Sequence, residues 1–382
     1  MPKKRVAIGI RLDQPWAHHF DVFAGIERYA LEHGNWDWVV EPFLHLVRQA
    51  HARANYDGVI ARATAELASQ AAELGVPLVN VEYGSLAAKL PSVLPNHRTC
   101  GRMAAEHLLL RGHRQFAFQG ASRHPGSRHA LAGFKAVLRA ARRPWTVHWY
   151  KPGSDEKPRA WHHYRAGLEQ WIRTWKPPLG LVTMMANRCR YVANACLRAG
   201  LRIPEDVGLI CLGDEPLICA RPEPSLSSII LGHDRAGYEA AALLDRMMAG
   251  EAAPETPVLI EPTELITRRS TDSFVVDDPL VRQALTFIAE HSHENLRADD
   301  VARHVHATGL TLRRHFHAAL GRTVIEEITR LRLERAKRLL VDSDKKIKQV
   351  ARDCGFTDAE YFDRVFVRVE GMSPGEYRRT KR

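Results

Sequence analysis

The sequence predicts an α/β region with parallel sheets in two lobes, followed by an all-α region that begins near residue 280. Up to about residue 270, short β-branched or apolar runs alternate with segments of helical periodicity. Beyond residue 279 no strand-like run remains. Within the helical region the pentapeptide VARHV at 301–305 has a near copy, VARDC, at 350–354. These observations together define the fold class.

The bulk composition limits the classes of protein to consider. The chain has 382 residues, enough for two or three domains, with 45% hydrophobic and 26% charged residues. A formal net charge of +11 predicts a polyanionic partner, with nucleic acid ahead of a membrane surface. No apolar stretch approaches the eighteen or so residues of a membrane span, and the N-terminal run VAIGI is too short for a signal peptide. We therefore expect a cytoplasmic protein with no membrane partner.

Six apolar runs in the front region are predicted to be strands: 6–10, 57–61, 77–81, 115–120, 179–184 and 207–212. Segments with helical periodicity lie between them, at 19–34, 100–113, 129–142 and 186–201. Strand, helix and strand at this spacing are typical of βαβ units and therefore of a parallel sheet. About ten such units exceed an ordinary single sheet, so two lobes are expected.

A polar and acidic stretch, RRSTDSFVVDDP at 268–279, closes the α/β region and ends in proline. We take 1–272 as the first domain, 273–279 as a linker and 280–382 as the second domain, with a helix start at Asp278 or Pro279. Seven helices are predicted from there to the C-terminus: 279–292, 298–305, 308–318, 323–341, 344–354, 357–369 and 373–379.

Each VAR copy places a small alanine, Ala302 or Ala351, between apolar neighbours on a helix. A polar turn follows, and a second helix begins at a threonine, Thr308 or Thr357, whose side-chain oxygen can accept from the free N–H groups of the first turn. A small residue in the first helix lets the second helix cross closely. Each copy is therefore predicted to form a helix-turn-helix unit.

The segment 323–342 joins the two units as one helix of about 20 residues, which spans roughly 30 Å. One turn of B-DNA is about 34 Å, so a rigid connector of this length would hold two recognition helices against successive major grooves. Residues 280–382 also contain 21 Lys or Arg against 15 Asp or Glu. Two ordinary helical hairpins are the alternative, but the length and the charge favour double-stranded DNA as the partner.

Residues 280–382 resemble the DNA-binding domain of the AraC/XylS family in three segments: RLRLERAKRLL (330–340), IKQVARDCGFTDAEYFDRVF (347–366) and GMSPGEYRR (371–379). The resemblance implies base-reading residues on the second helix of each unit: Leu310, Thr311, Arg313 and Arg314, then Asp358, Ala359, Glu360, Asp363 and Arg364. Arginine can pair with guanine, a carboxylate can accept from the cytosine amino group, and the two apolar side chains can meet a thymine methyl. By the same resemblance, phosphate contacts fall to Arg332, Lys346, Lys348 and Arg378.

The front region, roughly 4–270, resembles the LacI/GalR-type sensor domain in the segments 100–120, 187–215, 223–229 and 235–247. That resemblance implies a periplasmic-binding-protein-like fold, in which two α/β lobes joined by crossing strands bind a ligand between them. A LacI-type sensor ahead of an AraC-type reader is similar to the xylose operon regulator group. The order implies a ligand-responsive transcription regulator that acts as a homodimer with RNA polymerase as a partner, and activation is favoured over repression.

The sensor family places acidic residues and an arginine at four cleft positions, which in this chain hold Ala186, Gly213, Ala130 and Pro95. Their neighbours are the candidates to bind the ligand instead: Asn187, Asp214, Arg128 and Asn96. Asp13 and Trp16, after the first predicted strand, are further candidates, and Trp161 is a stacking candidate whose alternative is a core or surface role. The ligand therefore stays open between D-xylose, another sugar or polyol, and a non-sugar signal or none.

Other classes of protein find less support. Six scattered cysteines without metal-ligand spacing predict reduced thiols. The histidine pairs at 18–19 and 162–163 have no metal-binding motif around them, so solvated or capping roles are expected and no metal site. No nucleotide loop or hydrolase elbow occurs, so neither a cofactor nor enzymatic activity is expected. A solute-binding transport protein shares the front fold but has no use for 280–382; a constitutive regulator with a vestigial cleft is the closer alternative.

Overall fold

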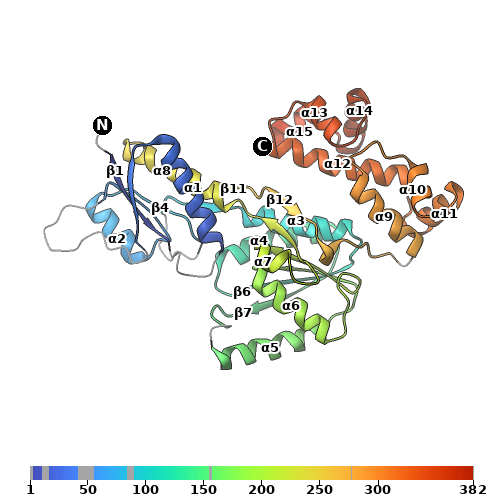
Figure 1. Cartoon of the computed structure of the whole chain (residues 1–382), viewed down its shortest axis with the longest axis horizontal. Coiled ribbons are helices and arrows are strands. Elements are labelled where there is room, and N and C mark those ends of the chain that lie inside the picture. The colour runs from blue at the N-terminus through green and yellow to red at the C-terminus, as the bar shows by residue number, and fades with distance from the viewer. Residues whose placement is uncertain are drawn as a thin grey trace. The chain divides into compact units, whose positions relative to one another are not determined.

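The computed structural model describes residues 3–10, 17–41, 56–83, 90–154, 157–276 and 278–381. The chain forms two compact units, Met1–Thr271 and Asp272–Arg382 (Figure 1). The first contains parallel sheets covered by helices, and the second contains helices alone among its described residues. The predicted fold class is confirmed. Among the described residues, every helix is too short or too polar to cross a membrane.

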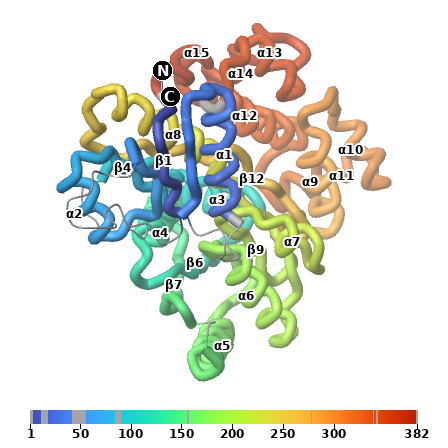
Figure 2. The backbone as a smooth tube through the Cα atoms, turned by 60° about the vertical axis from the view of Figure 1, so that its left-hand side comes forward, coloured from blue at the N-terminus to red at the C-terminus, as the bar shows by residue number. Residues whose placement is uncertain are grey.

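The first lobe is built on a parallel sheet of order β2-β1-β3-β4. Its strands are β1 (Lys4–Gly9), β2 (Trp36–Val40), β3 (Gly58–Ala61) and β4 (Leu78–Asn80). Helices α1 (Ala17–His33) and α8 (His233–Met248) lie side by side and cover one face (Figures 1 and 2), while α2 (Ala65–Leu74) covers the other. Because both faces are buried, β1, β3 and β4 contain continuous apolar runs, whereas the edge strand β2 is partly exposed.

The second lobe is built on a six-stranded sheet of order β12-β10-β9-β8-β6-β7, with β12 antiparallel to its neighbour. Its strands are β6 (Gln115–Ala121), β7 (Trp145–Tyr150), β8 (Leu179–Thr183), β9 (Val207–Leu212), β10 (Ser227–Ile230) and β12 (Glu264–Ile266). Helices α3 (His97–Leu110) and α4 (Pro125–Ala140) pack on one face, and α5 (Pro158–Ile172) and α6 (Ala186–Arg198) on the other. The short parallel pair β5 (Val93–Pro95) and β11 (Val258–Ile260) lies on the connections between the lobes, so the two-lobe prediction is confirmed.

Glycines bring two helix pairs unusually close. A Cβ atom on Gly133 of α4 would lie 1.9 Å from the carbonyl oxygen of Arg98 in α3, and one on Gly101 would lie 1.9 Å from the carbonyl oxygen of Ala130. The pair α1 and α8 repeats the arrangement, with Gly25 against the backbone of α8 and Gly237 against that of α1. Each lobe is thus held by one crossing at which the two backbones touch.

The second unit contains α9 (Pro279–His291), α10 (Ala298–His304), α11 (Gly309–Leu320), α12 (Val324–Asp342), α13 (Ile347–Asp353), α14 (Ala359–Glu370) and α15 (Pro374–Lys381). All seven predicted helices are present, and the first starts as predicted, with Asp278 as the N-cap and Pro279 as the first residue. Two cores form, and α12 belongs to both: Val324 and Ile328 pack in the first, and Leu333 and Leu340 in the second. One helix therefore joins the two helix-turn-helix units.

Candidate functional site

The first helix-turn-helix unit consists of α10 and α11. Ala302 is 5% exposed and packs with Leu312 and Phe316, as the sequence predicts. The turn passes through His306, whose φ of 53° is in the left-handed region. Thr308 then caps α11, because its Oγ1 accepts from the N–H of Thr311 at 3.2 Å, and the predicted cap is confirmed.

The face of α11 away from this core carries the candidate base readers. Leu310 is 69% exposed, Arg313 and Arg314 are exposed, and Thr311 is half-buried. The hydroxyls of Thr308 and Thr311 lie 2.8 Å apart and form a hydrogen bond. An exposed apolar side chain beside two guanidinium groups, on the first two turns of a helix, can meet both a thymine methyl and guanine acceptors.

The second unit consists of α13 and α14. Here the predicted cap is wrong: Asp358, and not Thr357, caps α14, since its two carboxylate oxygens accept from the N–H groups of Glu360 and Tyr361 at 3.0 and 3.2 Å. A charged oxygen is the stronger acceptor, so the helix begins one residue later. Exposed side chains on α14 are the remaining base-reading candidates, Glu360, Asp363 and Arg364, with Ala359 half-buried. Burial raises the pKa of Asp363 above its ordinary value.

Arg332 clamps the two units to each other. Its Nε donates to the carbonyl of Ser292 at 2.7 Å and its Nη2 to that of Glu294 at 2.8 Å, at the end of α9. Its guanidinium also lies 5.7 Å from the ring centre of Phe356 in the second unit. Next to that ring, Gly355 has a φ of 84°, and a Cβ there would lie 2.6 Å from the Ser292 carbonyl oxygen. The relative placement of the two recognition helices is fixed here as well as by α12.

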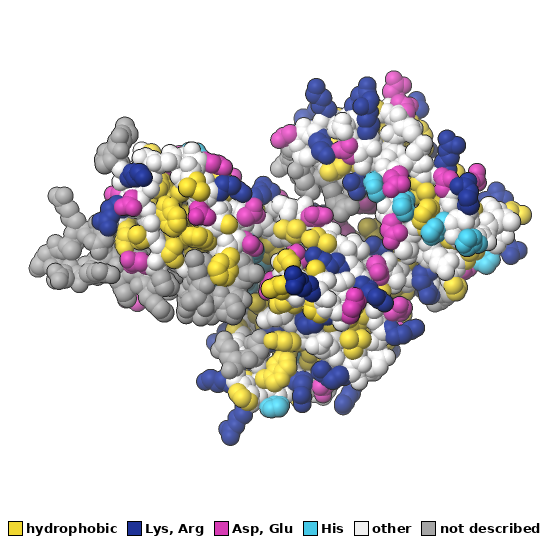
Figure 3. Space-filling view, viewed as in Figure 1, with side chains coloured by type: hydrophobic (Ala, Val, Ile, Leu, Met, Phe, Trp, Pro, Cys, Tyr) yellow, Lys and Arg dark blue, Asp and Glu magenta, His cyan; other side chains and the backbone are white. Residues whose placement is uncertain are grey.

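The four predicted phosphate contacts divide into two kinds. Lys346 and Lys348, at the start of α13, are exposed and available to a backbone phosphate. Arg378 donates to the carbonyls of Leu340 and Lys345, at 3.0 and 2.6 Å, and so closes the C-terminus of α12. Since the guanidinium groups of Arg332 and Arg378 already bind backbone carbonyls, any phosphate contact by them would come in addition to these bonds. Figure 3 shows further Lys and Arg side chains over the visible face of this unit.

Buried charge fixes the start of α12. Thr323 and Glu326 form a reciprocal capping box there. Glu327, whose side chain is fully buried, pairs with Arg322 at 2.6 Å and with Arg330 one turn further on. A carboxylate without contact with water requires such partners. The orientation of α12 relative to the first unit therefore depends on this one acidic side chain.

The predicted ligand residues of the second lobe lie where its strands end. Arg128 is exposed on α4, after β6; Asn187 is half-buried in the first turn of α6, after β8; and Asp214 follows β9. The carboxyl ends of parallel strands meet at one edge of the sheet, where open α/β folds bind ligands. Asp13 and Trp16 lie outside the described residues.

Three of the predicted ligand-binding residues, Asp214, Asn187 and Asn96, already form hydrogen bonds within the protein. Asp214 accepts from Arg268 at 2.8 Å and from Ser228 at 2.6 Å, both at Oδ1. Asn187 accepts from the N–H of the next residue at 2.7 Å. Asn96 caps α3 through the N–H of Thr99 and donates to Glu261 at 2.6 Å. These three candidates bond to other groups and, within the described part of the chain, not to one another.

Trp161 packs on the core of the second lobe, with its ring 4.8 Å from that of Tyr191 and 5.6 Å from that of Tyr164. The core role, which was the alternative in the sequence, therefore accounts for it.

The sequence did not predict a group of histidines around Glu82. His18 and His19 come from the first turn of α1, and Glu82 follows β4. His18 Nε2 lies 3.7 Å from Glu82 Oε2, and His124 Nε2, from the second lobe, lies 3.7 Å from Oε1. His19 is 4% exposed, so the expectation of a solvated side chain is wrong for it. The signal that could have found the group is position, since each member follows the carboxyl end of a strand.

The electrostatics around this group favour an ionised Glu82 and neutral imidazoles at two neighbouring histidines, His97 and His233. Burial acts to raise the pKa of Glu82, but the imidazoles of His124 and His18 outweigh it and hold the pKa well below its ordinary value. Burial and the neighbouring His124 lower the pKa of His97 to about 3. Burial beside His18 lowers the pKa of His233 to about 3 as well. At neutral pH the carboxylate is therefore ionised and these two buried imidazoles can offer lone pairs.

Residues 105–271 match the periplasmic binding protein-like domain family, and residues 301–380 match a helix-turn-helix domain family. Over 331 residues the chain is 30% identical to the xylose operon regulatory protein of Escherichia coli K12. The aligned region covers 84% of this chain and 83% of that protein. Its counterpart from Haemophilus influenzae is 27% identical over 288 residues, 75% of this chain and 74% of that one.

Among solved structures, that of the xylose-binding transcription activator xylR has a TM-score of 0.59 at 26% identity and covers 100% of this chain and 99% of that chain. A LacI family transcriptional regulator from Mycobacterium smegmatis has a TM-score of 0.54 at 23% identity over 70% of this chain and 98% of that chain, which supports the fold of the first unit.

Proposed function

This chain belongs to the family of xylose operon regulatory proteins, and from that premise we propose that it is a sugar-responsive transcription regulator that binds double-stranded DNA through both helix-turn-helix units. The observation that carries the proposal is the shared helix α12, which packs into the cores of both units. Its 19 residues span about 28 Å, close to the roughly 34 Å between successive major grooves on one face of a duplex.

Base recognition falls to exposed and half-buried side chains at the starts of α11 and α14. In the first unit these are Leu310, Thr311, Arg313 and Arg314, and in the second Asp358, Ala359, Glu360, Asp363 and Arg364. The carboxylate of Asp358 serves first as a helix cap, so it can reach a base only while keeping its two backbone bonds. Lys346 and Lys348 contact phosphates, whereas Arg332 and Arg378 act mainly by holding the two units in register.

The first domain, 1–272, senses the ligand and dimerises, and 273–279 links it to the reader. Proteins that are similar along most or all of this chain are named for xylose, so a pentose such as D-xylose is the first candidate effector, ahead of other sugars and polyols. In the described part of the chain, Asp214 binds its partners through Oδ1 alone, which leaves Oδ2 to accept from a sugar hydroxyl. Asn187 and Arg128 are its companions at the same edge, and Asn96, which follows β5 and caps α3, is a further candidate.

The regulator works in the cytoplasm as a homodimer on repeated half-sites, because a single module of this size gives limited specificity. Activation through RNA polymerase is the mode that the family suggests. The alternatives are a response to a non-sugar signal and a constitutive regulator.

The DNA part of the proposal is tested by selecting binding sites for the full chain and comparing two variants. Arg364→Ala is expected to relax selection at one base position and to cost about 1–3 kcal/mol there. Lys348→Ala is expected to weaken all sequences evenly and to reduce the salt slope by about 1. Identical selected sites for Arg364→Ala and the unaltered protein would remove the base-reading role of Arg364.

The sensing part is tested by titration calorimetry with D-xylose, followed by pentoses, hexoses and polyols. Asn187→Ala should abolish saturable binding, whereas Asn194→Ala, an exposed asparagine on the same helix, should preserve it. A bound sugar at 100 times its Kd should also stabilise the protein by about 2.7 kcal/mol. No heat and no stabilisation across the panel would refute sugar sensing and leave the DNA reader intact.

A further inference from the structure

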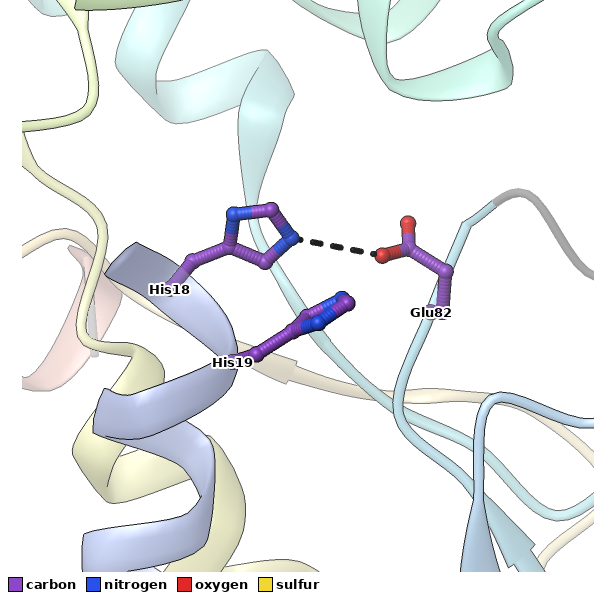
Figure 4. A group of neighbouring side chains, drawn as sticks. All are labelled: His18, His19 and Glu82. Atoms are coloured by element: carbon purple, nitrogen blue, oxygen red, sulfur yellow. Dashed lines mark ion pairs between the residues drawn. The ribbon is translucent and has the colours of Figure 1, made fainter. Parts of the chain in front are cut away.

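Three side chains of the first lobe converge on one point at the edge of its sheet. Figure 4 shows His18 and His19, neighbours on α1, with both rings turned toward the carboxylate of Glu82. One potential ligand atom from each lies within 4.8 Å of the other two. Two atoms that bind one ion at about 2.1 Å each lie at most about 4.2 Å apart, so small rotations of the side chains bring all three into range.

The space between them suits a single ion. A cavity of about 10 Å³ is lined by His18, His19 and Glu82, together with apolar side chains, Ile10, Val22 and Val81, and by Arg62. That volume is close to the space that one water molecule requires, and far too small for a sugar. The polar ligand atoms therefore surround a site for one small species.

The chemistry of the ligands then selects the species. Two imidazoles and a carboxylate are the ligand set that Zn²⁺ and neighbouring divalent transition ions take, with further positions left open. We propose that His18, His19 and Glu82 bind one such ion, and that His124 of the second lobe holds the other oxygen of the Glu82 carboxylate in place.

His124 gives the site a consequence for the whole sensor. Its Nε2 lies 3.7 Å from Glu82 Oε1, whereas His18 Nε2 lies 3.7 Å from the other oxygen, Oε2. Because His124, just before α4 in the second lobe, contacts the carboxylate that holds the ion in the first lobe, the site links the two lobes. This consequence rests on the proposed function: if sugar binding closes the lobes, ion and sugar bind with positive coupling, which must be reciprocal.

Arg62 distinguishes a cation site from an anion site. Its guanidinium lines the same cavity, and like charges repel, so it lowers the affinity for a cation. Arg62→Ala should therefore tighten Zn²⁺ binding several-fold. If the cavity binds an anion instead, Arg62→Ala should weaken the binding of that anion.

The test uses the full chain, stripped with a chelator and titrated with Zn²⁺ against a chromophoric chelator, with bound metal counted by mass spectrometry. We expect one ion per chain. Glu82→Gln, which keeps the shape of the side chain, and His18→Ala should each weaken binding by at least about 100-fold. The double variant His162→Ala/His163→Ala removes the other adjacent pair, which is exposed on α5, and should bind as the unaltered chain does. Circular dichroism verifies that each variant is folded.

His124→Ala tests the tie between the lobes. It should weaken Zn²⁺ binding by about 10-fold or more and remove any effect of Zn²⁺ on sugar affinity. No stoichiometric ion, or equal binding by folded Glu82→Gln and the unaltered chain, overturns the site. Stoichiometric Zn²⁺ binding without any sugar response would support the site and refute the proposed function. Sugar binding without Zn²⁺ binding would support the proposed function and refute the site.

Discussion

Replacement of Gly133 by alanine should destabilise the second lobe, because the added methyl group has no room. The new Cβ would lie 1.9 Å from the carbonyl oxygen of Arg98, whereas real Cβ atoms essentially never approach within 3.0 Å of another atom. Helices α3 and α4 would therefore have to separate by at least about 1 Å. The obstacle is backbone and not a flexible side chain, so no rotamer change removes it.

The cost follows from three contributions. Overpacking of this kind costs about 1–3 kcal/mol. A gap of 0.5–1 Å forfeits about a quarter to a half of each dispersion contact along the helix pair, which includes Phe134 and Cys100. The greater helix propensity of alanine returns about 0.5–1 kcal/mol. The net expectation is a loss of about 2 kcal/mol.

Gly167→Ala in α5 is the matched control, because its Cβ would meet only His148 Nε2, at 3.9 Å, within ordinary contact distance. It should stabilise by about 0.5–1 kcal/mol. Thermal unfolding of the full chain by circular dichroism should show a Tm lowered by about 4–8 °C for Gly133→Ala, since 1 kcal/mol corresponds to about 2–4 °C in a unit of this size, and raised by about 1–4 °C for the control. A Tm for Gly133→Ala at or above that of the unaltered chain would refute the close crossing.

Three further predictions concern charge. Burial lowers the pKa of His97, His113 and His233 to about 3, whereas a histidine in the unfolded chain titrates near 6.5, so below pH 6.5 the unfolded state binds more protons. The free energy of unfolding, measured in urea, should therefore fall by about 2 kcal/mol per histidine between pH 6.5 and 5. A free energy that does not change over this range would contradict the prediction. Glu327→Ala should destabilise the helical unit by about 3 kcal/mol, against less than 1 for Glu334→Ala, whose pair is on the surface; equal losses would exclude the buried role. Arg332→Ala should weaken DNA binding, measured by fluorescence anisotropy, most on sites that both helix-turn-helix units of one chain contact. An equal loss on sites that only one unit contacts would favour a phosphate contact instead.

The strands that could be predicted from the sequence are those buried on both faces. All six predicted runs are strands, because a continuous apolar run such as 207–212 has no other stable place in an α/β lobe. The strands that were not predicted, among them β2 (WDWVV) and β7 (WTVHWY), mix exposed and half-buried residues, so their apolar signal is interrupted. The helices after residue 278 were predicted to within three residues at each end because the apolar period is regular there, although the cap predicted at Thr357 lies at Asp358.

The candidate site could be predicted only in part, for a reason of geometry. The reading helices are local in sequence, and their exposed faces follow from periodicity alone. The histidine group is not local: His18 and His19, Glu82 and His124 belong to three segments that only the sheet topology brings together. A search for metal-binding spacings covers ligands within one motif and cannot find such a group. The order of the strands in the sheet can reveal such a group, because it determines which loops lie at the same edge of the sheet.

The distribution of charge between the two lobes differs from that of a cleft lined with free carboxylates, and this difference bears on how the protein senses its ligand. In the second lobe, Asp214 is already paired with Arg268, so its charge is largely neutralised before any ligand arrives. In the first lobe, Glu82 stays ionised because imidazoles surround it, and one of these, His124, comes from the opposite lobe. A contact between the lobes therefore already exists at Glu82, whereas Asp214 can contribute hydrogen-bond direction through Oδ2. Closure in this protein should accordingly depend more on the metal occupancy of the site around Glu82 than on Asp214.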